Sequence, residues 1–155
     1  MPPSQVQVRR VDAAEADLVA PLFALYRQFY GQPYDEEKAA GFLRDRVSLG
    51  QSVVLVAEVA REPVGFTQLY PTFSSVSAAV KWVLNDLYVV ASARGNGVAA
   101  ALMAHAELLA RAAGACSLTL ETGSDNVTAQ RLYKRQGYRV EHGVKHYEKP
   151  LTAVQ

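Results

Sequence analysis

Two glycines and an arginine mark the stretch of sequence whose chemistry is clearest. Arg94, Gly95 and Gly97 lie in a short polar loop between an apolar segment and an alanine-rich segment. Glycines let backbone N–H groups crowd together at the start of a helix, because no Cβ stands in the way. A helix N-terminus carries about half a positive charge and several unpaired backbone N–H donors. It is therefore a binding site for an anion such as a pyrophosphate. We therefore expect this loop to bind a nucleotide-like anion.

The same loop also fits a dinucleotide-binding fingerprint. The run from Gly95 to Ala100 matches G-x-G-x-x-[G/A], and Glu121 ends the next expected strand, where a ribose-binding acid would lie. Residues 91–94 separate the preceding strand from the first glycine, whereas in the fingerprint that glycine follows its strand almost directly. A nicotinamide-dependent oxidoreductase is therefore the less favoured alternative. A nucleoside triphosphatase loop is excluded, since the chain has no Gly-Lys-Ser or Gly-Lys-Thr.

The elements that must position this loop follow from the hydrophobic pattern. Asp12 is expected to cap the first helix, and Gly31, Gly50 and Gly114 are expected to end helices. The predicted order is β-α-α-β-β-β-α-β-α-β-β, an α/β (α+β) sheet with helices on both faces. The expected strands are 6–11, 53–59, 64–71, 80–90, 117–121 and one or two within 138–149, and the expected helices are 13–30, 35–49, 97–113 and 128–136.

Length and composition narrow the class of protein. With 155 residues, half of them hydrophobic, the chain is expected to form a single domain over residues 1–155. A formal net charge of +1 gives no field that would attract nucleic acid or an acidic membrane. Cys116 is the only cysteine, which excludes an internal disulfide and suits the reducing cytoplasm. We expect no secretion signal, no membrane span and no metal, since the histidines and Cys116 lack the spacing of metal ligands.

A second motif follows the loop after one further strand. Taken singly, its residues have ordinary explanations: Asn126 could cap a helix, Ala129 could allow close packing, and Tyr133 could be a core aromatic. Gly137 could simply end the helix. Their joint order favours a functional element. The motif reads Asn126-x-x-Ala129-x-x-Leu132-Tyr133-x-x-x-Gly137-Tyr138, and the loop before it reads Arg94-x-x-Gly97-x-Ala99.

Together the two motifs resemble the signatures of the GNAT superfamily of N-acetyltransferases. The resemblance covers essentially the whole chain, is strongest from Leu84 to Tyr138, and is closest to the histone/polyamine and diamine acetyltransferase groups. It implies the GNAT fold, with a mixed central sheet of six to seven strands. It also implies acetyl-CoA as the acyl donor, and a homodimer paired through exposed strands. The residues that it implies for acetyl-CoA binding are Leu87, Tyr88, Val89, Arg94, Gly95, Asn96, Gly97, Val98, Ala99, Ala100, Asn126, Ala129 and Tyr133.

The resemblance further implies direct attack of an amine on the thioester in a ternary complex. The backbone N–H of Val89 would polarise the thioester carbonyl, and the Tyr133 hydroxyl would stand near the sulfur as the acid. No covalent enzyme intermediate is needed, and Cys116 is expected to be a small buried hydrophobe rather than a nucleophile. The alternative is a CoA-binding module of the same shape that lacks turnover.

The acceptor is expected to be a primary amine, either a small amine or polyamine or a lysine side chain. At the catalytic position where the polyamine group carries a glutamate, this chain has Asn85, and an amide is not a base. Strand alternation is expected to turn Asp86 to the opposite face. Glu121 is therefore expected to hold a proton-relay water or the cationic amine, unless it is only a solvated strand end. Tyr30 and Tyr34 flank the turn where this family forms its amine pocket.

Overall fold

The computed structural model describes residues 5–153 and places five strands in one mixed sheet, in the order β1-β2-β3-β4-β5. Strands β1 to β4 pair antiparallel, and β5 joins β4 in parallel. The strands are β1 (Val6–Val11), β2 (Val53–Val59), β3 (Glu62–Ser74), β4 (Ala79–Val89) and β5 (Leu118–Thr119), and the helices are α1 (Ala16–Phe29), α2 (Glu36–Ser48), α3 (Val98–Ala112) and α4 (Val127–Arg135).

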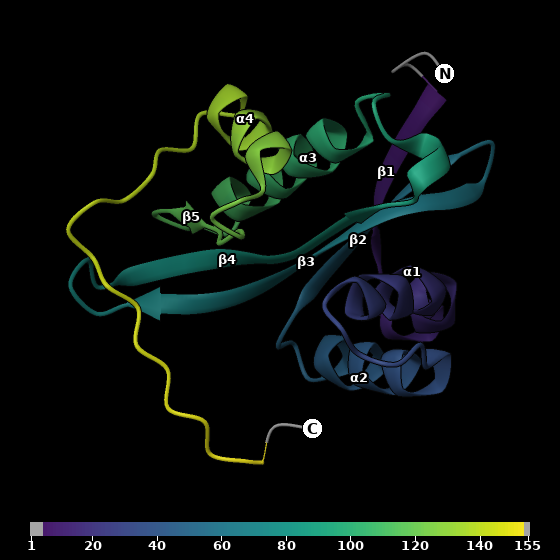
Figure 1. The fold of residues 1–155 in the computed structure, drawn as a ribbon, viewed down its shortest axis with the longest axis horizontal. Coiled ribbons are helices and arrows are strands. Elements are labelled where there is room, and N and C mark those ends of the chain that lie inside the picture. Colours follow the sequence, from purple (N-terminus) through teal and green to yellow (C-terminus); the bar gives the residue numbers. More distant parts are fainter. Residues whose placement is uncertain (1–4, 154–155) are drawn as a thin grey trace.

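Helices cover both faces of the sheet, as the sequence predicted. Figure 1 shows α1 and α2 together on one side of the strands and α3 with α4 on the other. One hydrophobic cluster lies beneath α1 and α2, with Phe23, Leu43 and Phe66 among its buried members. A second lies beneath α3, where Leu102 and Met103 are buried. The burial of these apolar side chains holds the helices on the sheet.

Local signals account for where the helices begin. Asp12 accepts a hydrogen bond from the N–H of Glu15 and caps a short 3₁₀ turn, Ala13–Glu15, that leads into α1. Asp35 caps α2 by accepting from the N–H of Lys38 at 3.0 Å. The predicted helix positions are therefore confirmed to within a few residues at each end.

A close approach of backbone to backbone positions α3 against the sheet. A Cβ built on Gly65 would lie 3.0 Å from the carbonyl oxygen of Tyr88 and 3.1 Å from Cγ1 of Val98. Only a residue without a side chain leaves room for both β4 and the first turn of α3 at this point. This contact fixes the start of α3 above the end of β4.

The expected closing strands are absent from the described part of the chain. Residues 138–153 form no helix or strand, so the sheet has five strands rather than the six to seven that we expected. The alternation of residues 138–146 suits a strand, but a strand forms only beside a neighbouring edge. Figure 1 shows this segment (yellow) running away from α4 and past the ends of β3 and β4 instead of along β5.

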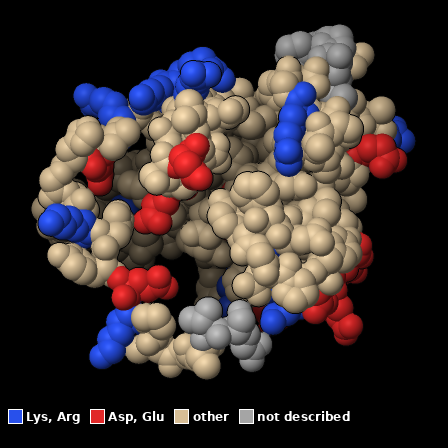
Figure 2. All heavy atoms as spheres, in the orientation of Figure 1, with Lys and Arg blue, Asp and Glu red and all other residues tan. Residues whose placement is uncertain are grey.

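Within residues 5–153, no helix is long and apolar enough to cross a bilayer. Figure 2 shows positive and negative side chains interspersed over one face of the molecule. The same view shows that face hollowed beside the C-terminal segment.

Candidate functional site

The loop before α3 has the backbone geometry of an anion site. Gly95 and Gly97 have φ of +77° and +79°, a region that other residues rarely adopt. Gly97 is the N-cap of α3, and no side chain caps that end of the helix. The N–H of Ala101 is bonded to the carbonyl of Gly97, whereas a helix leaves its earlier N–H groups without partners. Those free donors are available to a phosphate group.

Arg94 and Asn96 fix the loop in place. The Nε of Arg94 donates to the carbonyl oxygen of Val89 at 2.9 Å, and its guanidinium lies over the ring of Tyr88, 5.6 Å from the ring centre. The side chain of Asn96 donates to the carbonyls of Ala93 and Arg94. These bonds tie the loop to the end of β4, so that the loop and the strand form one rigid unit.

The edge of β4 that faces β5 is open over its last residues. β5 pairs with β4 through two residues only. On the other edge of β4, the N–H of Val90 donates to the carbonyl of Val64 at 2.9 Å. Because the backbone groups of successive residues alternate between the two edges of a strand, the N–H groups of Leu87 and Val89 point toward the open edge. A strand-like ligand could add to β4 there.

Asn85 lies in a β-bulge, and the expectation that Asp86 points to the opposite face is wrong. Gln68 pairs with Asp86 and Leu69 pairs with Leu84, so Asn85 is the extra residue on β4. Nδ2 of Asn85 donates to Oδ1 of Asp86 at 2.7 Å, and both side chains line one cavity. Strand alternation fails here because a bulge adds a residue that has no partner on the neighbouring strand.

Asp86 is a buried carboxylate held by neutral donors. The residue is 2% exposed, and Nε2 of Gln68 donates to its Oδ2 at 2.5 Å. Burial raises the pKa of the Asp86 carboxyl, while hydrogen bonds from Gln68, Asn85 and Tyr26 oppose the rise. A carboxylate with a raised pKa is a stronger base than an ordinary aspartate. Sequence reasoning set Asp86 aside, and the sequence carries no signal of the bulge that brings it into the cavity.

The cavity beside Asp86 has a volume of about 360 Å³ and lies between the sheet and helices α1 and α2. Its walls combine aromatic rings with two cationic side chains, and Asp86 supplies its carboxylate. Burial raises the pKa of Tyr70 to about 12, so its hydroxyl stays protonated at neutral pH. The residues lining the cavity are Phe23, Arg27, Lys38, Phe42, Tyr70, Asn85 and Asp86.

Tyr133 projects from α4 and does not line the cavity beside Asp86; it borders a second cavity instead. Asn126 caps this helix, as predicted, by accepting from the N–H of Ala129 at 3.2 Å. Burial and the neighbouring Tyr30 raise the pKa of the half-buried Tyr133 hydroxyl, and a hydrogen bond with Thr122 opposes the rise. The Tyr133 hydroxyl is therefore a protonated donor at neutral pH.

Glu121 lies apart from these groups. Its side chain is 80% exposed, and its carboxylate lies 3.5 Å from Nδ1 of His146 in the C-terminal segment. Glu121 lines neither of the two cavities described here. Its geometry is that of a solvated strand end.

The two tyrosines between the first helices lie at the surface. Tyr30 is 60% exposed and packs edge-on against Tyr26, with 5.0 Å between the ring centres. The Tyr34 hydroxyl donates to Glu36. Of the pair, Tyr30 contributes to the raised pKa of Tyr133, whereas the Tyr34 hydroxyl is engaged within its own turn.

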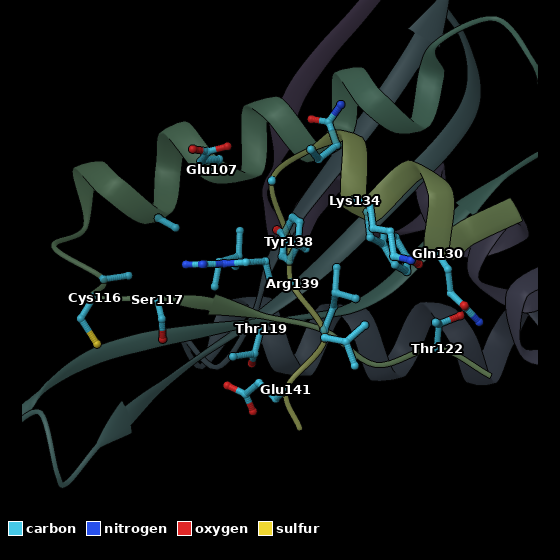
Figure 3. A pocket seen from close by; sticks show the side chains of 18 of the residues that line it. Glu107, Cys116, Ser117, Thr119, Thr122, Gln130, Lys134, Tyr138, Arg139 and Glu141 are labelled. Carbon is cyan, nitrogen blue, oxygen red and sulfur yellow. The ribbon is translucent and has the colours of Figure 1, made fainter. Parts of the chain in front are cut away.

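A second, larger cavity of about 870 Å³ borders Tyr133. Figure 3 shows its walls: Glu107 from α3, Thr119 from β5, Gln130 and Lys134 from α4, and the start of the C-terminal segment. Cys116 lines this cavity and is exposed, so the expectation of a buried cysteine is wrong. The glycine loop does not line it.

Taken together, these groups suit acyl transfer. Free N–H groups at α3 can hold an anion, and the N–H of Val89 can polarise a carbonyl placed on the open edge of β4. A protonated tyrosine can supply a proton to a leaving group, and a buried carboxylate can take one up. No covalent step on the enzyme is required by this arrangement.

Comparisons with known proteins agree with this chemistry. Residues 19–138 match the family model described as "Acetyltransferase (GNAT) family". The uncharacterized N-acetyltransferase YhfO of Bacillus subtilis (strain 168) is 44% identical over 142 residues, which cover 92% of this chain and 95% of that protein. A "probable acetyltransferase" of Haemophilus influenzae is 34% identical over 59% of this chain and 63% of its own length.

A solved structure supports the same assignment. The crystal structure of a "probable acetyltransferase" superposes with a TM-score of 0.88 at 38% identity, and the match covers 95% of this chain and 99% of that one. These findings set aside the nicotinamide-dependent oxidoreductase. The chain therefore belongs to the acetyltransferase (GNAT) family of acyl-transferring enzymes.

Proposed function

We propose that this enzyme transfers the acetyl group of acetyl-CoA to a primary amine by direct attack in a ternary complex. The observation that carries the proposal is the sequence of groups along β4. The buried carboxylate of Asp86, the N–H of Val89 on the open edge of β4 and the uncapped start of α3 follow one another in this order between residues 86 and 98. In the same order, the carboxylate can accept the proton of an amine, the N–H can polarise the carbonyl of a thioester, and the helix start can bind a pyrophosphate.

The donor site consists of the loop and the open edge of β4. The pyrophosphate of acetyl-CoA is held by the N–H groups that follow Gly95 and Gly97. Arg94 holds the loop against the end of β4 through its hydrogen bond to Val89. The pantetheine arm pairs with the backbone of Leu87 and Val89 like an added strand. Asn126 caps α4 by accepting from the N–H of Ala129, and we propose that both residues and Tyr133 on this helix contact the donor. The other donor contacts are Tyr88, Asn96, Val98, Ala99 and Ala100.

Tyr133 acts as the acid for the departing thiolate. Its pKa lies above that of a free tyrosine because of burial and the neighbouring Tyr30, so the hydroxyl carries its proton at neutral pH. Donation from a hydroxyl to sulfur neutralises the charge that develops as the C–S bond breaks.

Asp86 accepts the proton of the amine, directly or through a water. An alkyl ammonium has a pKa of about 10, so forming the reactive neutral amine at neutral pH costs roughly 4 kcal/mol. A buried carboxylate attracts the ammonium and then offers its proton a strong acceptor. Asn85 holds this carboxylate by its 2.7 Å hydrogen bond and is a positioning residue. Glu121 stays an alternative acceptor of the amine, although its exposed carboxylate lines neither cavity.

The acceptor is a small primary amine or a lysine side chain. The cavity of about 360 Å³ beside Asp86 takes an amine on a short chain, with Phe23 and Phe42 against its methylene groups. Tyr30 and Tyr34, exposed at the turn between α1 and α2, would contact a longer acceptor outside the cavity.

A non-catalytic CoA-binding module is the second candidate, because Asn85 replaces the glutamate of the polyamine enzymes. Two measurements together test the two candidates, and the second separates them. Calorimetry with CoA is expected to show binding in either case. Release of free thiol from acetyl-CoA, measured with a panel of polyamines, amino acids, aminoglycosides and lysine peptides, is expected for the enzyme with at least one amine. CoA binding without thiol release for any amine would favour the module, and no CoA binding would overturn both.

A further inference from the structure

The cavity between the sheet and helices α1 and α2 is lined by more positive than negative charge. Arg27, half-buried on α1, and Lys38, exposed on α2, both line it. Asp86 is the only carboxylate among the described residues of its wall. At about 360 Å³ the cavity lies at the small end of the range for ligand sites, which is about 300–1,000 Å³. This size suits a small molecule, and the charges select which amines bind.

The two lining cations do not neutralise Asp86. Within residues 5–153, neither Arg27 nor Lys38 forms an ion pair with that carboxylate. Burial raises the pKa of Asp86, and the groups that oppose this rise are all neutral hydrogen-bond donors. A cation within about 4–6 Å would lower the pKa of a carboxyl group as well. The cations therefore lie away from Asp86, toward another part of the cavity.

Arg46 adds a third positive charge beside this cavity. Its guanidinium lies over the ring of Phe42, 5.3 Å from the ring centre, and Phe42 lines the cavity. Burial and Asp86 raise the pKa of the lining Tyr70 hydroxyl, and Arg46 opposes the rise. Nε of Arg46 is buried, and no described residue accepts a hydrogen bond from it. In the described part of the chain, this guanidinium also has no carboxylate partner.

An anionic group would give these cations the partner that the chain does not supply. A buried donor without an acceptor costs free energy, because its hydration is lost without replacement. Guanidinium groups match the oxygens of carboxylates and phosphates, which accept several hydrogen bonds at once. A second ammonium group on the ligand would instead add a like charge beside the three cations. The cavity therefore suits a molecule with a positive and a negative end.

We infer that the acceptor is a small amine that carries an acidic group, a carboxylate or a phosphate, at the other end of a short chain. The inference rests on the proposed function, because it places the amine at Asp86. The acidic group lies with Arg27, Lys38 and Arg46, and the aromatic walls of the cavity contact the chain between the two ends. Polyamines, which carry only cationic groups, are then poor acceptors.

The first test compares amines that share one carbon chain. The series is pentylamine, the diamine cadaverine, the aminopentanoate with its amine at the far end, and aminopentyl phosphate. In a thiol-release assay, one of the two acidic amines is expected to exceed pentylamine in kcat/KM at least tenfold, and cadaverine to fall below pentylamine. The better of the two identifies the acidic group. Equal or higher kcat/KM for pentylamine or cadaverine would overturn the inference and leave the proposed function intact.

Calorimetry on the CoA-saturated protein keeps the two proposals distinguishable. It measures the affinities of the same four amines without turnover, and the same order is expected. Absence of thiol release with every amine would count against the proposed function alone, since these affinities still decide the inference. Absence of any preference for an acidic amine in binding would overturn the inference.

The second test removes the charges one at a time. Arg27→Gln and Arg46→Gln are each expected to raise KM for the acidic amine about tenfold at unchanged kcat, because a hydrogen bond to a charged group contributes about that factor. Lys38→Gln is expected to give a smaller rise, and its exposed position keeps this variant folded. All three should lower KM for cadaverine, because a repelling charge is removed.

Arg44→Gln is the matched control for these variants. Arg44 lies on the same helix as Arg46, its guanidinium pairs with Asp17 at 3.2 Å, and it does not line the cavity. Its KM values are expected to stay those of the wild type. An equal rise in KM for the acidic amine in Arg44→Gln, or no rise in any variant, would overturn the inference.

Discussion

Nδ2 of Asn85 lies 2.7 Å from Oδ1 of Asp86, although the two residues are neighbours on a strand. Neighbouring side chains on a regular strand point to opposite faces, so this contact exists only because of the bulge at Asn85. The bulge brings a buried carboxylate to the cavity between the sheet and α1–α2. It therefore changes the group that we expect to receive the proton of the amine.

Asp86→Asn is expected to lower kcat/KM for the amine by about 10²- to 10⁴-fold, because the proton acceptor is lost while the shape is kept. CoA affinity measured by calorimetry should stay the same. Glu121→Gln is the matched control, since it makes the same chemical change in an exposed side chain. We expect only a small effect there. The reverse outcome, with loss of rate in Glu121→Gln alone, would assign the amine to Glu121.

The same substitution is expected to change how stability depends on pH. Burial raises the pKa of Asp86 in the folded state above its unfolded value, so the folded state binds the proton more tightly. The charged carboxylate then costs stability at neutral pH, and this cost disappears as the pH falls through the folded pKa. Asparagine also loses an acceptor for the hydrogen bonds from Gln68 and Asn85, a cost that does not vary with pH. Chemical denaturation should therefore find that the stability of Asp86→Asn relative to wild type decreases as the pH falls from 7 toward 4. A constant difference would argue against the raised pKa.

Tyr133→Phe is expected to slow turnover by on the order of 10²-fold or more while CoA affinity is kept, because only the hydroxyl is removed. Tyr138→Phe provides the control. Its ring centre lies 6.3 Å from that of Tyr133. Tyr138 is also half-buried, and burial raises its own pKa to about 12. Steady-state kinetics with saturating acetyl-CoA separates the two. Equal turnover in wild type and Tyr133→Phe would make Tyr133 a packing residue.

Gly97→Val is expected to abolish CoA binding measured by calorimetry, because the valine side chain would occupy the space proposed for the pyrophosphate. The substitution also costs stability, since φ is +79° at this glycine, and a left-handed conformation costs other residues about 1–2 kcal/mol. Gly114 has the same φ of +79° at the other end of α3 and free space around it. Gly114→Val should therefore lose similar stability but keep CoA binding. Loss of binding in both variants would point to unfolding rather than to a phosphate site.

Local signals in the sequence were enough to predict the glycine loop and the helix caps. Asp12, which we expected to cap, and Asn126, for which capping was one explanation, both cap helical turns through their own side chains, and Gly97 is left-handed because its place at the helix start requires it. Each of these features depends on residues a few positions apart. A resemblance carried by such local motifs was therefore enough to predict a donor side for the proposed site.

The acceptor side could not be predicted in the same way. The bulge at Asn85 depends on how β3 pairs with β4 across the sheet, and no residue within β4 signals it. The segment after Tyr138 has a strand pattern, but whether a strand forms depends on an available edge. Both errors concern pairing between distant segments, which a single chain's periodicity does not encode.

Asn85→Glu is expected to move the acid limb of the pH–rate profile to higher pH. The amide of Asn85 donates to Asp86 and lowers the pKa of that carboxyl, opposing the effect of burial. Glutamate removes this donor and places a second carboxylate beside the first, and like charges raise each other's pKa. Asn85→Ala removes the donor without adding a charge, so it should shift the same limb by a smaller amount. The measured quantity is the pH at which the rate has fallen by half on the acid side. If Asp86 is the base, this pH increases from wild type to Asn85→Ala and again to Asn85→Glu. If all three profiles coincide, the titrating group lies elsewhere in the cleft, and Glu121 becomes the next carboxylate to test.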